Sequence, residues 1–280
     1  MKQREPVSLT TAAEQLGVHY MTAYRYVRTG RLPATKDGAQ WRVDPDDIDR
    51  LRNGPSIPSR RGSREQARQR LERRMIAGDT VGSWTVIEQI LASGATPAEI
   101  HLDVLVPALR EVGVRWANGE LSVADEHRAS ATAQRLLGRL GPRFAHHGRT
   151  RGTIVIGAPA GDAHALPSAI MSDLLRDRRF AVIDLGADAP PDSFVDAASE
   201  ADRLRAVCIG ASGAGRDDAI VETVAALRDR GLDVPVLVGG GAIRDARHAR
   251  QLGADGWTGA DARSAIETIE AIATRPRTSH

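Results

Sequence analysis

The chain has 280 residues, of which 41% are hydrophobic and 26% charged, with a mean hydropathy of −0.30. This composition excludes a disordered or fibrous chain, and the length predicts two or three domains. No stretch approaches the ~20 apolar residues that a membrane helix needs, so we expect no membrane partner. The N-terminus lacks a signal-peptide core, and the single Cys208 excludes an internal disulfide, so we expect a cytoplasmic protein.

Positive charge is concentrated at the start of the sequence. Residues 1–76 contain 16 Lys and Arg against 9 Asp and Glu, whereas the whole chain has a net charge of only +2. Residues 77–280 therefore have a net charge of −5. This asymmetry predicts an anionic partner for the first quarter of the chain only.

A winged helix-turn-helix is predicted for the first domain, residues 1–55. Two short helices, residues 9–18 and 19–28, surround a turn at Gly17, and a hairpin with a turn at Gly38 follows as a wing. The second helix of such a motif enters the DNA major groove. We expect DNA contacts from Thr22, Arg25, Arg28, Arg31, Lys36 and Arg42. The alternative is a helical hairpin with solvated arginines.

Residues 7–52 also resemble the winged helix-turn-helix domains of the excisionase-like and MerR-like families. The resemblance implies double-stranded operator DNA as the partner. The operator sequence is not readable, because single base contacts contribute only ~1–3 kcal/mol and depend on docking geometry.

An all-α four-helix bundle is predicted for residues 65–147, after a Pro-, Gly- and Ser-rich linker at residues 56–64. Apolar residues recur at intervals of three and four without strand-like alternation. The expected helices are residues 65–78, 79–93, 97–115 and 121–140. Thr96, Pro97 and Glu99 form a strong helix start for the third.

An α/β domain with a Rossmann-like (flavodoxin-like) parallel sheet is predicted for residues 150–275. Short apolar runs alternate with Gly-containing turns and helical stretches, which is typical of a doubly wound sheet. The expected strands are residues 153–158, 181–185, 206–209, 234–238 and 256–259, with a closing helix at 261–273. Ligands bind such sheets at the carboxyl ends of the strands.

Three of the expected strand ends carry unusual residues. Asp162 and His164 follow the first strand, Ser212 follows the third, and Gly239-Gly240 follow the fourth. An imidazole in this position is suited to metal ligation, and a carboxylate two residues earlier fixes its tautomer. Adjacent glycines let a bulky group approach the backbone, although they also serve ordinary tight turns. No dinucleotide fingerprint or P-loop is present, which disfavours nucleotide cofactors.

Together these residues resemble the cobalamin-binding Rossmann-like domain. The resemblance implies that His164 replaces the lower base of the corrinoid as cobalt ligand, assisted by Asp162. It further implies that Ser212 contacts the displaced tail base and that Gly239 and Gly240 make room for the tail. The family commonly has Gly three residues after the histidine, whereas this chain has Pro167, which affects the loop geometry.

Nine residues separate Trp116 from the pair Glu126-His127 in the expected bundle. Taken singly, a buried Trp or a helical His is usually structural. The spacing resembles the bundle of CarH-type adenosylcobalamin-dependent photoreceptors, a resemblance that covers residues 7–273. It implies that Trp116 and Glu126 contact the upper adenosyl group and that His127 is a replacement upper ligand after light.

The resemblance implies a transcriptional regulator that represses as a dark oligomer (dimer or tetramer) and releases DNA in light. We expect no enzyme activity. Two alternatives stay open at this point. One is a corrinoid methyl carrier, which shares the bundle and the sheet but has no use for a helix-turn-helix. The other is a regulator that senses cobalamin or another tetrapyrrole without photochemistry.

Overall fold

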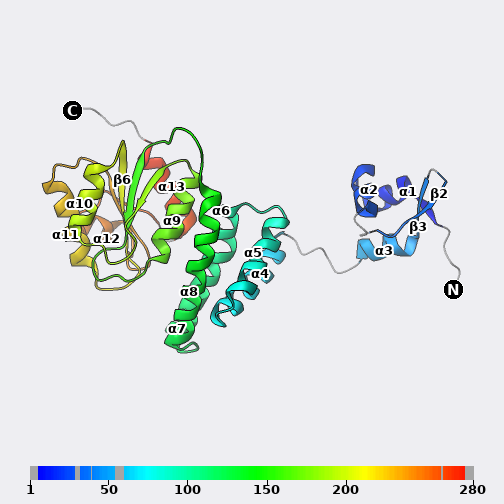
Figure 1. Cartoon of the computed structure of the whole chain (residues 1–280), viewed down its shortest axis with the longest axis horizontal. Coiled ribbons are helices and arrows are strands. Elements are labelled where there is room, and N and C mark those ends of the chain that lie inside the picture. Colours follow the sequence, from blue (N-terminus) through cyan, green and yellow to red (C-terminus); the bar gives the residue numbers. More distant parts are fainter. Residues whose placement is uncertain (1–5, 29–31, 39, 54–59, 260, 275–280) are drawn as a thin grey trace. The chain divides into compact units, whose positions relative to one another are not determined.

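The computed structural model describes residues 6–28, 32–38, 40–53, 60–259 and 261–274 (Figure 1). The chain divides into two compact units, residues 1–63 and 64–280. Among the described residues, no helix has the length and apolar character required to cross a membrane. Each unit has its own hydrophobic core and is treated separately below.

The first unit is a winged helix-turn-helix, as predicted. Its elements are β1 (Val7–Ser8), α1 (Leu9–Leu16), α2 (Tyr20–Arg28), β2 (Thr35–Asp37), β3 (Gln40–Val43) and α3 (Pro45–Asn53). Gly17 ends α1 in the left-handed conformation at φ 66°, so that α2 begins three residues later. The strands form an antiparallel sheet in the order β1-β3-β2. The sequence reading missed β1 and α3, and Ile48 of α3 completes the small core.

The second unit begins with the helical bundle. Its elements are α4 (Arg60–Ile76), α5 (Thr80–Ala92), α6 (Pro97–Ile100), η1 (His101–Leu105), α7 (Val106–Ala117), α8 (Val123–Leu140) and η2 (Gly141–Phe144). The predicted linker, residues 56–64, is wrong for its last five residues, which belong to α4. A helix tolerates Gly62 at a cost of about 1 kcal/mol, and no proline follows it before Ile76. Residues 54–59 lie outside the described part of the chain.

The predicted helix at residues 97–115 contains a turn of π-helix. Thr96 and Glu99 form the expected capping box at its start. The five residues of η1 then interrupt the α-helical pattern before α7 resumes it. Pro107 has no N–H to donate, which removes an α-helical hydrogen bond at this position. Periodicity alone does not reveal such a turn.

The sheet domain consists of five parallel strands in the order β5-β4-β6-β7-β8. The strands are β4 (Thr153–Gly157), β5 (Ala181–Asp184), β6 (Leu204–Gly210), β7 (Val236–Gly239) and β8 (Gly256–Trp257). The helices are α9 (Leu166–Asp177), α10 (Pro191–Glu200), α11 (Asp217–Asp229), α12 (Ala246–Gln251) and α13 (Ala262–Ala273). This is the predicted flavodoxin-like order, in which the chain reverses direction across the sheet between β4 and β6.

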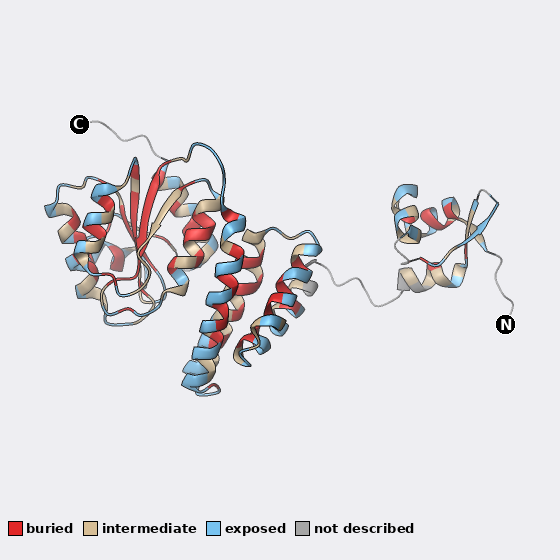
Figure 2. Cartoon of the chain, in the orientation of Figure 1, coloured by how far each residue is buried: buried red, intermediate tan, exposed pale blue. Residues whose placement is uncertain are grey.

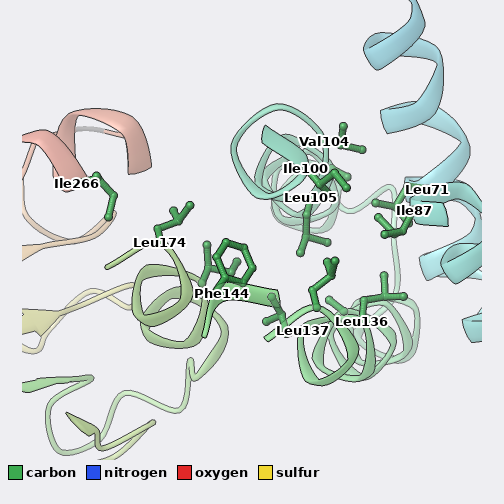
Figure 3. Packing of buried hydrophobic residues seen from close by; sticks show 14 of the residues in the cluster. Leu71, Ile87, Ile100, Val104, Leu105, Leu136, Leu137, Phe144, Leu174 and Ile266 are labelled. Atoms are coloured by element: carbon green, nitrogen blue, oxygen red, sulfur yellow. The ribbon is translucent and has the colours of Figure 1, made fainter. Parts of the chain in front are cut away.

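The bundle and the sheet share one hydrophobic core. Leu105 and Leu136 of the bundle belong to the same buried cluster as Leu174 of α9 and Ile266 of α13 (Figure 3). Buried residues lie on the strands and on one side of the helices of this unit (Figure 2). The other face of the sheet packs against α10, α11 and α12 in a separate cluster. The domains predicted at 65–147 and 150–275 are thus parts of one unit.

A buried polar pair adds to this shared core. His101 lies in η1 with no exposed surface, and its Nε2 lies 3.1 Å from Oδ2 of Asp173 in α9. The ring also packs against Phe144, with 4.8 Å between the ring centroids. The π-helical turn therefore carries a histidine that contacts a carboxylate of the sheet domain. Apolar residues surround this polar pair.

A glycine after β7 allows two strand ends to approach each other closely, and this approach can be tested. Gly240 has φ +92°, and a Cβ there would overlap the backbone of Ala211. A left-handed conformation costs a non-glycine residue about 1–2 kcal/mol. We expect Gly240→Ala to lower the free energy of unfolding by more than about 1 kcal/mol, measured by urea denaturation with circular dichroism.

The neighbouring glycine is a matched control. A Cβ at Gly241 would meet nothing closer than the Ser212 carbonyl oxygen at 3.9 Å. Gly241→Ala is therefore expected to change the unfolding midpoint little. Equal stability of the two variants would contradict the close approach at Gly240.

Candidate functional site

The candidate site lies at the reversal point of the sheet. The loop after β4 leads from Pro159 to α9, and the loop after β6 leads from Ala211 to α11. These strands are hydrogen-bonded neighbours, with Gly157 opposite Ile209 at the end of the pair. Because the adjoining connections leave toward opposite faces, the two loops diverge and leave space for a ligand.

Asp162 and His164 form the centre of this site. The Asp162 carboxylate is fully buried, and its Oδ1 lies 2.6 Å from Nδ1 of His164. The imidazole is 60% exposed, and its Nε2 has no hydrogen-bond partner among the described residues. A carboxylate at Nδ1 favours the tautomer with its proton on Nδ1. Nε2 is then a lone-pair donor that faces solvent.

The same carboxylate joins the two loops across the reversal point. Its Oδ2 accepts hydrogen bonds from the backbone N–H of Ser212 at 2.7 Å and of Gly213 at 3.2 Å. Its Oδ1 also accepts from the backbone N–H of His164 at 3.1 Å. Ser212 therefore lies beside the histidine loop, as predicted, although its backbone makes the contact.

These hydrogen bonds control the ionisation of Asp162. Burial by itself raises the pKa of this carboxyl group, whereas the bonds from His164, Ser212 and Gly213 lower it. The hydrogen bonds prevail, and the pKa lies below its ordinary value. Asp162 is consequently ionised at neutral pH.

Gly239 and Gly240 first serve the protein's own packing. A Cβ at Gly239 would overlap the Thr258 hydroxyl, and one at Gly240 would overlap Ala211. By contrast, Gly210 has only the Gly157 carbonyl oxygen at 4.0 Å from such a Cβ. The glycines bring three strand ends close together, and the tail contact predicted for Gly239 and Gly240 stays a prediction.

Pro167 is the second residue of α9, so it begins the helix as the sequence suggested. Its missing N–H is no loss at the first helical turn, where that group has no intrahelical partner. Ala165 precedes the helix, and its carbonyl oxygen accepts a hydrogen bond from the Ser168 hydroxyl. Proline in place of the family's glycine is therefore compatible with an exposed His164.

The bundle brings Glu126 toward this loop. The helix α8 runs toward the connector and β4 runs away from it, so the start of α8 and the end of β4 lie on the same side (Figure 1). Burial raises the pKa of Glu126, but the Ser130 hydroxyl, His127 and the charge of His164 lower it below its ordinary value. Glu126 thus lies at the end of the bundle that is on the same side as the His164 loop.

The other two predicted bundle residues are more exposed. His127 is 74% exposed, and its Nδ1 lies 2.7 Å from Oε2 of Glu126. Trp116 lies in the last turn of α7 with 47% of its surface exposed, so it is not a core residue. Their predicted roles toward a cofactor stay predictions.

Two polar groups near the site were missed from the sequence. Nε of Arg216 and Nε1 of Trp257 are buried without a hydrogen-bond partner in the described structure. The Arg216 guanidinium lies against Gly161, where a Cβ would come within 3.0 Å of it. Trp257 pairs with Val238, the residue before Gly239. In the sequence, only its place after Gly215 in a strand-end loop indicated that Arg216 lies near the site. Nothing in the sequence indicated this for Trp257.

The predicted DNA-contacting residues are divided by the structure. Arg25, Arg28 and Lys36 are exposed, whereas Thr22 is half-buried. Arg42 forms an ion pair with Asp37 on the wing at 3.6 Å, which reduces its availability to phosphate. Arg31 lies outside the described residues.

Cys208 is buried in β6, and burial raises the pKa of its thiol to about 12. The thiol is therefore protonated at neutral pH and acts as a small core residue, as expected.

Comparison with known proteins identifies all three parts. Residues 67–140 and residues 152–269 each match a family model of a B12 binding domain, and residues 7–54 match a helix-turn-helix domain. The chain is 32% identical over 161 residues to a corrinoid protein of Desulfitobacterium hafniense, covering 55% of this chain and 73% of that protein. It is 33% identical over 169 residues to the dimethylamine corrinoid protein of Methanosarcina barkeri, covering 57% and 76% respectively.

A solved structure has the same fold. The monomethylamine corrinoid protein of Methanosarcina barkeri superimposes with a TM-score of 0.64 at 17% identity. The match covers 74% of this chain and 99% of that one. At this identity the likeness concerns the fold alone.

Asp162 offers a test of the site's internal bonding. We expect Asp162→Asn to reduce the free energy of unfolding by roughly 1–3 kcal/mol at pH 7, because an amide oxygen replaces an ionised acceptor and leaves buried N–H groups poorly satisfied. The depressed pKa contributes stability above the unfolded value of about 3.9, and this contribution is lost as the pH falls through the folded pKa. The difference between wild type and variant should therefore shrink below about pH 4.

The measurement is denaturant unfolding of both proteins from pH 7 to pH 3. His164→Ala is the comparison, since it removes one bond to the Asp162 carboxylate but leaves the backbone bonds in place, so we expect a smaller loss with the same dependence on pH. A difference that stays constant over this pH range would exclude ionisation of Asp162 as its cause.

Proposed function

The chain belongs to the family of cobalamin-binding corrinoid proteins, and we propose that it is a cobalamin-dependent transcriptional regulator that responds to light. The observation that carries this proposal is the joining of a helix-turn-helix domain to two B12 binding domains in one chain. A DNA-binding domain in the same chain allows the state of the corrinoid to control DNA binding rather than a catalysed reaction. In this proposal the protein is not an enzyme.

The residues at the carboxyl edge of the sheet fit a corrinoid. His164 presents an unpartnered Nε2, and imidazole nitrogen is a common ligand of first-row metals. The unpartnered N–H groups of Arg216 and Trp257 are donors suited to the amide and nucleotide groups that a corrinoid carries. These observations support cobalamin as the cofactor, and we propose its adenosyl form.

The protein groups then have separate tasks. His164 would bind cobalt through Nε2, and Asp162 keeps its ring in the required tautomer and orientation. Trp116 and Glu126 cover the upper group from the bundle. When bound, adenosylcobalamin supplies a cobalt–carbon bond that visible light breaks. His127, which is largely exposed, would be available as a second imidazole ligand once that bond is broken.

The DNA-binding output depends on assembly. One winged helix offers few phosphate contacts, whereas several linked copies gain affinity through effective concentration, by factors of 10²–10⁴. We propose that the dark protein is a homo-oligomer that represses from operator DNA. Movement of the bundle at His127 disturbs the assembly and so separates the DNA-binding units.

A corrinoid methyl carrier is the second candidate. It is favoured by the relatives, which are named as corrinoid proteins, one of them for dimethylamine. Those matches cover 55% and 57% of this chain. A regulator that senses cobalamin or another tetrapyrrole without photochemistry is the third. The candidates differ in whether DNA affinity depends on light and on the upper ligand of cobalt.

Illumination of the reconstituted full chain separates these functions. We expect the dark protein with adenosylcobalamin to bind operator DNA at least tenfold more tightly than after green light, because of lost avidity. The measurement is gel retardation with a genomic fragment library, beside the absorbance spectrum and the molar mass from light scattering. Methylcobalamin-loaded protein is the control.

The results distinguish the three candidates. DNA affinity that depends on cobalamin but not on light would favour the non-photochemical sensor. DNA affinity indifferent to cobalamin, together with methyl transfer from a partner methyltransferase, would favour the carrier.

Alanine variants of the two histidines are expected to differ from wild type at different stages, one before illumination and the other after it. His164→Ala should weaken the cobalamin complex before illumination, because the lower ligand is lost. His127→Ala should alter the spectrum only after illumination, because a second imidazole no longer reaches the metal. Absorbance spectra before and after light measure both effects. Identical spectra of wild type and His127→Ala after light would remove His127 from the scheme.

A further inference from the structure

A cavity lies at the opposite end of the sheet from Asp162 and His164. It has a volume of about 200 Å³ and is formed where the connector between η2 and β4 passes the turn between α9 and β5. The lining includes connector residues 145–150, the arginines Arg176 and Arg179, and the start of β5 at Ala181. Ala181 pairs with Thr153, the first residue of β4, which places the cavity at the amino ends of the strands.

The lining of this cavity is cationic. It contains Arg149, Arg176, Arg179 and two histidines, and no carboxylate. The guanidinium groups of Arg149 and Arg179 are exposed, and neither has a carboxylate partner in the described part of the chain. Arg176 is bound to Asp173 and to the Val182 carbonyl. Two arginine side chains at this cavity are therefore left with unused charge.

Neighbouring arginines show the contrast. Arg151 and Arg178 lie close by in the sequence, and both donate to Glu270 of α13. The protein thus supplies a carboxylate for these two side chains but not for Arg149 and Arg179. Their charge is not a general excess, because residues 77–280 have a net charge of −5.

The backbone at Arg179 also points to a role for its side chain. Arg179 adopts a left-handed conformation with φ 66°, which glycine adopts without cost. Its amide and carbonyl groups are fixed by hydrogen bonds to Arg176 and from Arg151. Its guanidinium lies over Gly148, 3.8 Å from the position of a Cβ there. An arginine is thus held in a conformation unfavourable to it, with its charge at the cavity.

The connector provides further donors. Within the described structure, the N–H groups of residues 146–150 make no backbone hydrogen bond. Successive free N–H groups in a turn form concave sites for anions. Planar guanidinium groups bind phosphate oxygens in pairs. The cavity therefore offers two guanidinium groups to a phosphate, beside connector N–H groups that make no backbone hydrogen bond.

We propose that this cavity binds a small molecule bearing a phosphate or diphosphate group. Its volume of about 200 Å³ equals roughly seven waters at ~30 Å³ each, which is less than the ~300–1,000 Å³ of pockets for larger ligands. A phosphoryl group fits this space, and a duplex does not enter it. The acidic balance of this unit also disfavours DNA, since a polyanion senses the whole field whereas a small anion senses the local charge.

The cavity lies where the chain passes from the bundle to the sheet, so a bound ligand would affect how these two parts are held together. The chain passes from the bundle to the sheet through residues 145–152, between η2 and β4. An anion bound by Arg149 of the connector and Arg179 of the α9–β5 turn links these two segments. Binding therefore resists movement of the bundle relative to the sheet, whether or not cobalamin is present.

The test is isothermal titration of the full chain with inorganic phosphate, pyrophosphate and a nucleoside diphosphate, at constant ionic strength in chloride. We expect saturable binding of pyrophosphate, weakened at least tenfold by Arg149→Gln and by Arg179→Gln. Arg143→Gln is the matched control, because this exposed arginine of η2 lies outside the cavity lining and removes the same charge. It should change affinity by less than twofold. Thermal unfolding establishes that each variant is folded.

Three results would overturn the proposal. One is the absence of saturable pyrophosphate binding to the wild type. Another is equal weakening by all three variants, which would indicate a bulk charge effect. The third is loss of duplex DNA affinity in Arg149→Gln and Arg179→Gln with pyrophosphate binding unchanged, which would make this surface a nucleic-acid contact. A nucleoside diphosphate that binds more tightly than pyrophosphate would identify a nucleotide as the source of the phosphate.

Discussion

The candidate site depends on one buried carboxylate that serves two loops at once. Asp162 accepts a hydrogen bond from His164 with one oxygen and from the N–H groups of Ser212 and Gly213 with the other. These loops leave adjacent strands at the point where the sheet reverses, and nothing covalent joins them there. The ionised carboxylate therefore sets the position of the imidazole relative to the sheet. It also leaves Nε2 as the nitrogen available to a ligand.

The fold was predictable where its determinants are local. Glycine-bounded apolar runs gave the parallel strands, and Thr96 with Glu99 gave the start of a bundle helix. The errors fall where local signals conflict with packing. Residues 60–64 have the composition of a linker, yet they form the first part of α4. The helix that carries Ile48 was not predicted, because its sequence is rich in acidic residues, yet it completes the core of the first unit. The union of bundle and sheet into one unit was also missed, because shared burial has no sequence periodicity.

Only the part of the site that depends on residues close together in the sequence was predictable. Asp162 and His164 are two residues apart, so their pairing follows from the loop itself. The charge interaction between Glu126 and His164 links residues of different elements and depends on how the bundle packs. Gly239 was read as space for a ligand, whereas a side chain there would first overlap Thr258. Sequence alone does not separate a glycine needed by the protein from one needed by a cofactor.

The shared core also limits how a bundle of this kind moves. Leu105 and Leu136 are buried with Leu174 of the sheet domain, and His101 bonds to Asp173 within the same cluster. Full separation of the bundle would expose this apolar surface to water and break the contact between His101 and Asp173, which is costly. Glu126, at the opposite end of α8 from the connector, is held by fewer such contacts. The start of α8 is therefore the part of the bundle that the shared core restrains least, because the buried residues of α8 begin at Ala129.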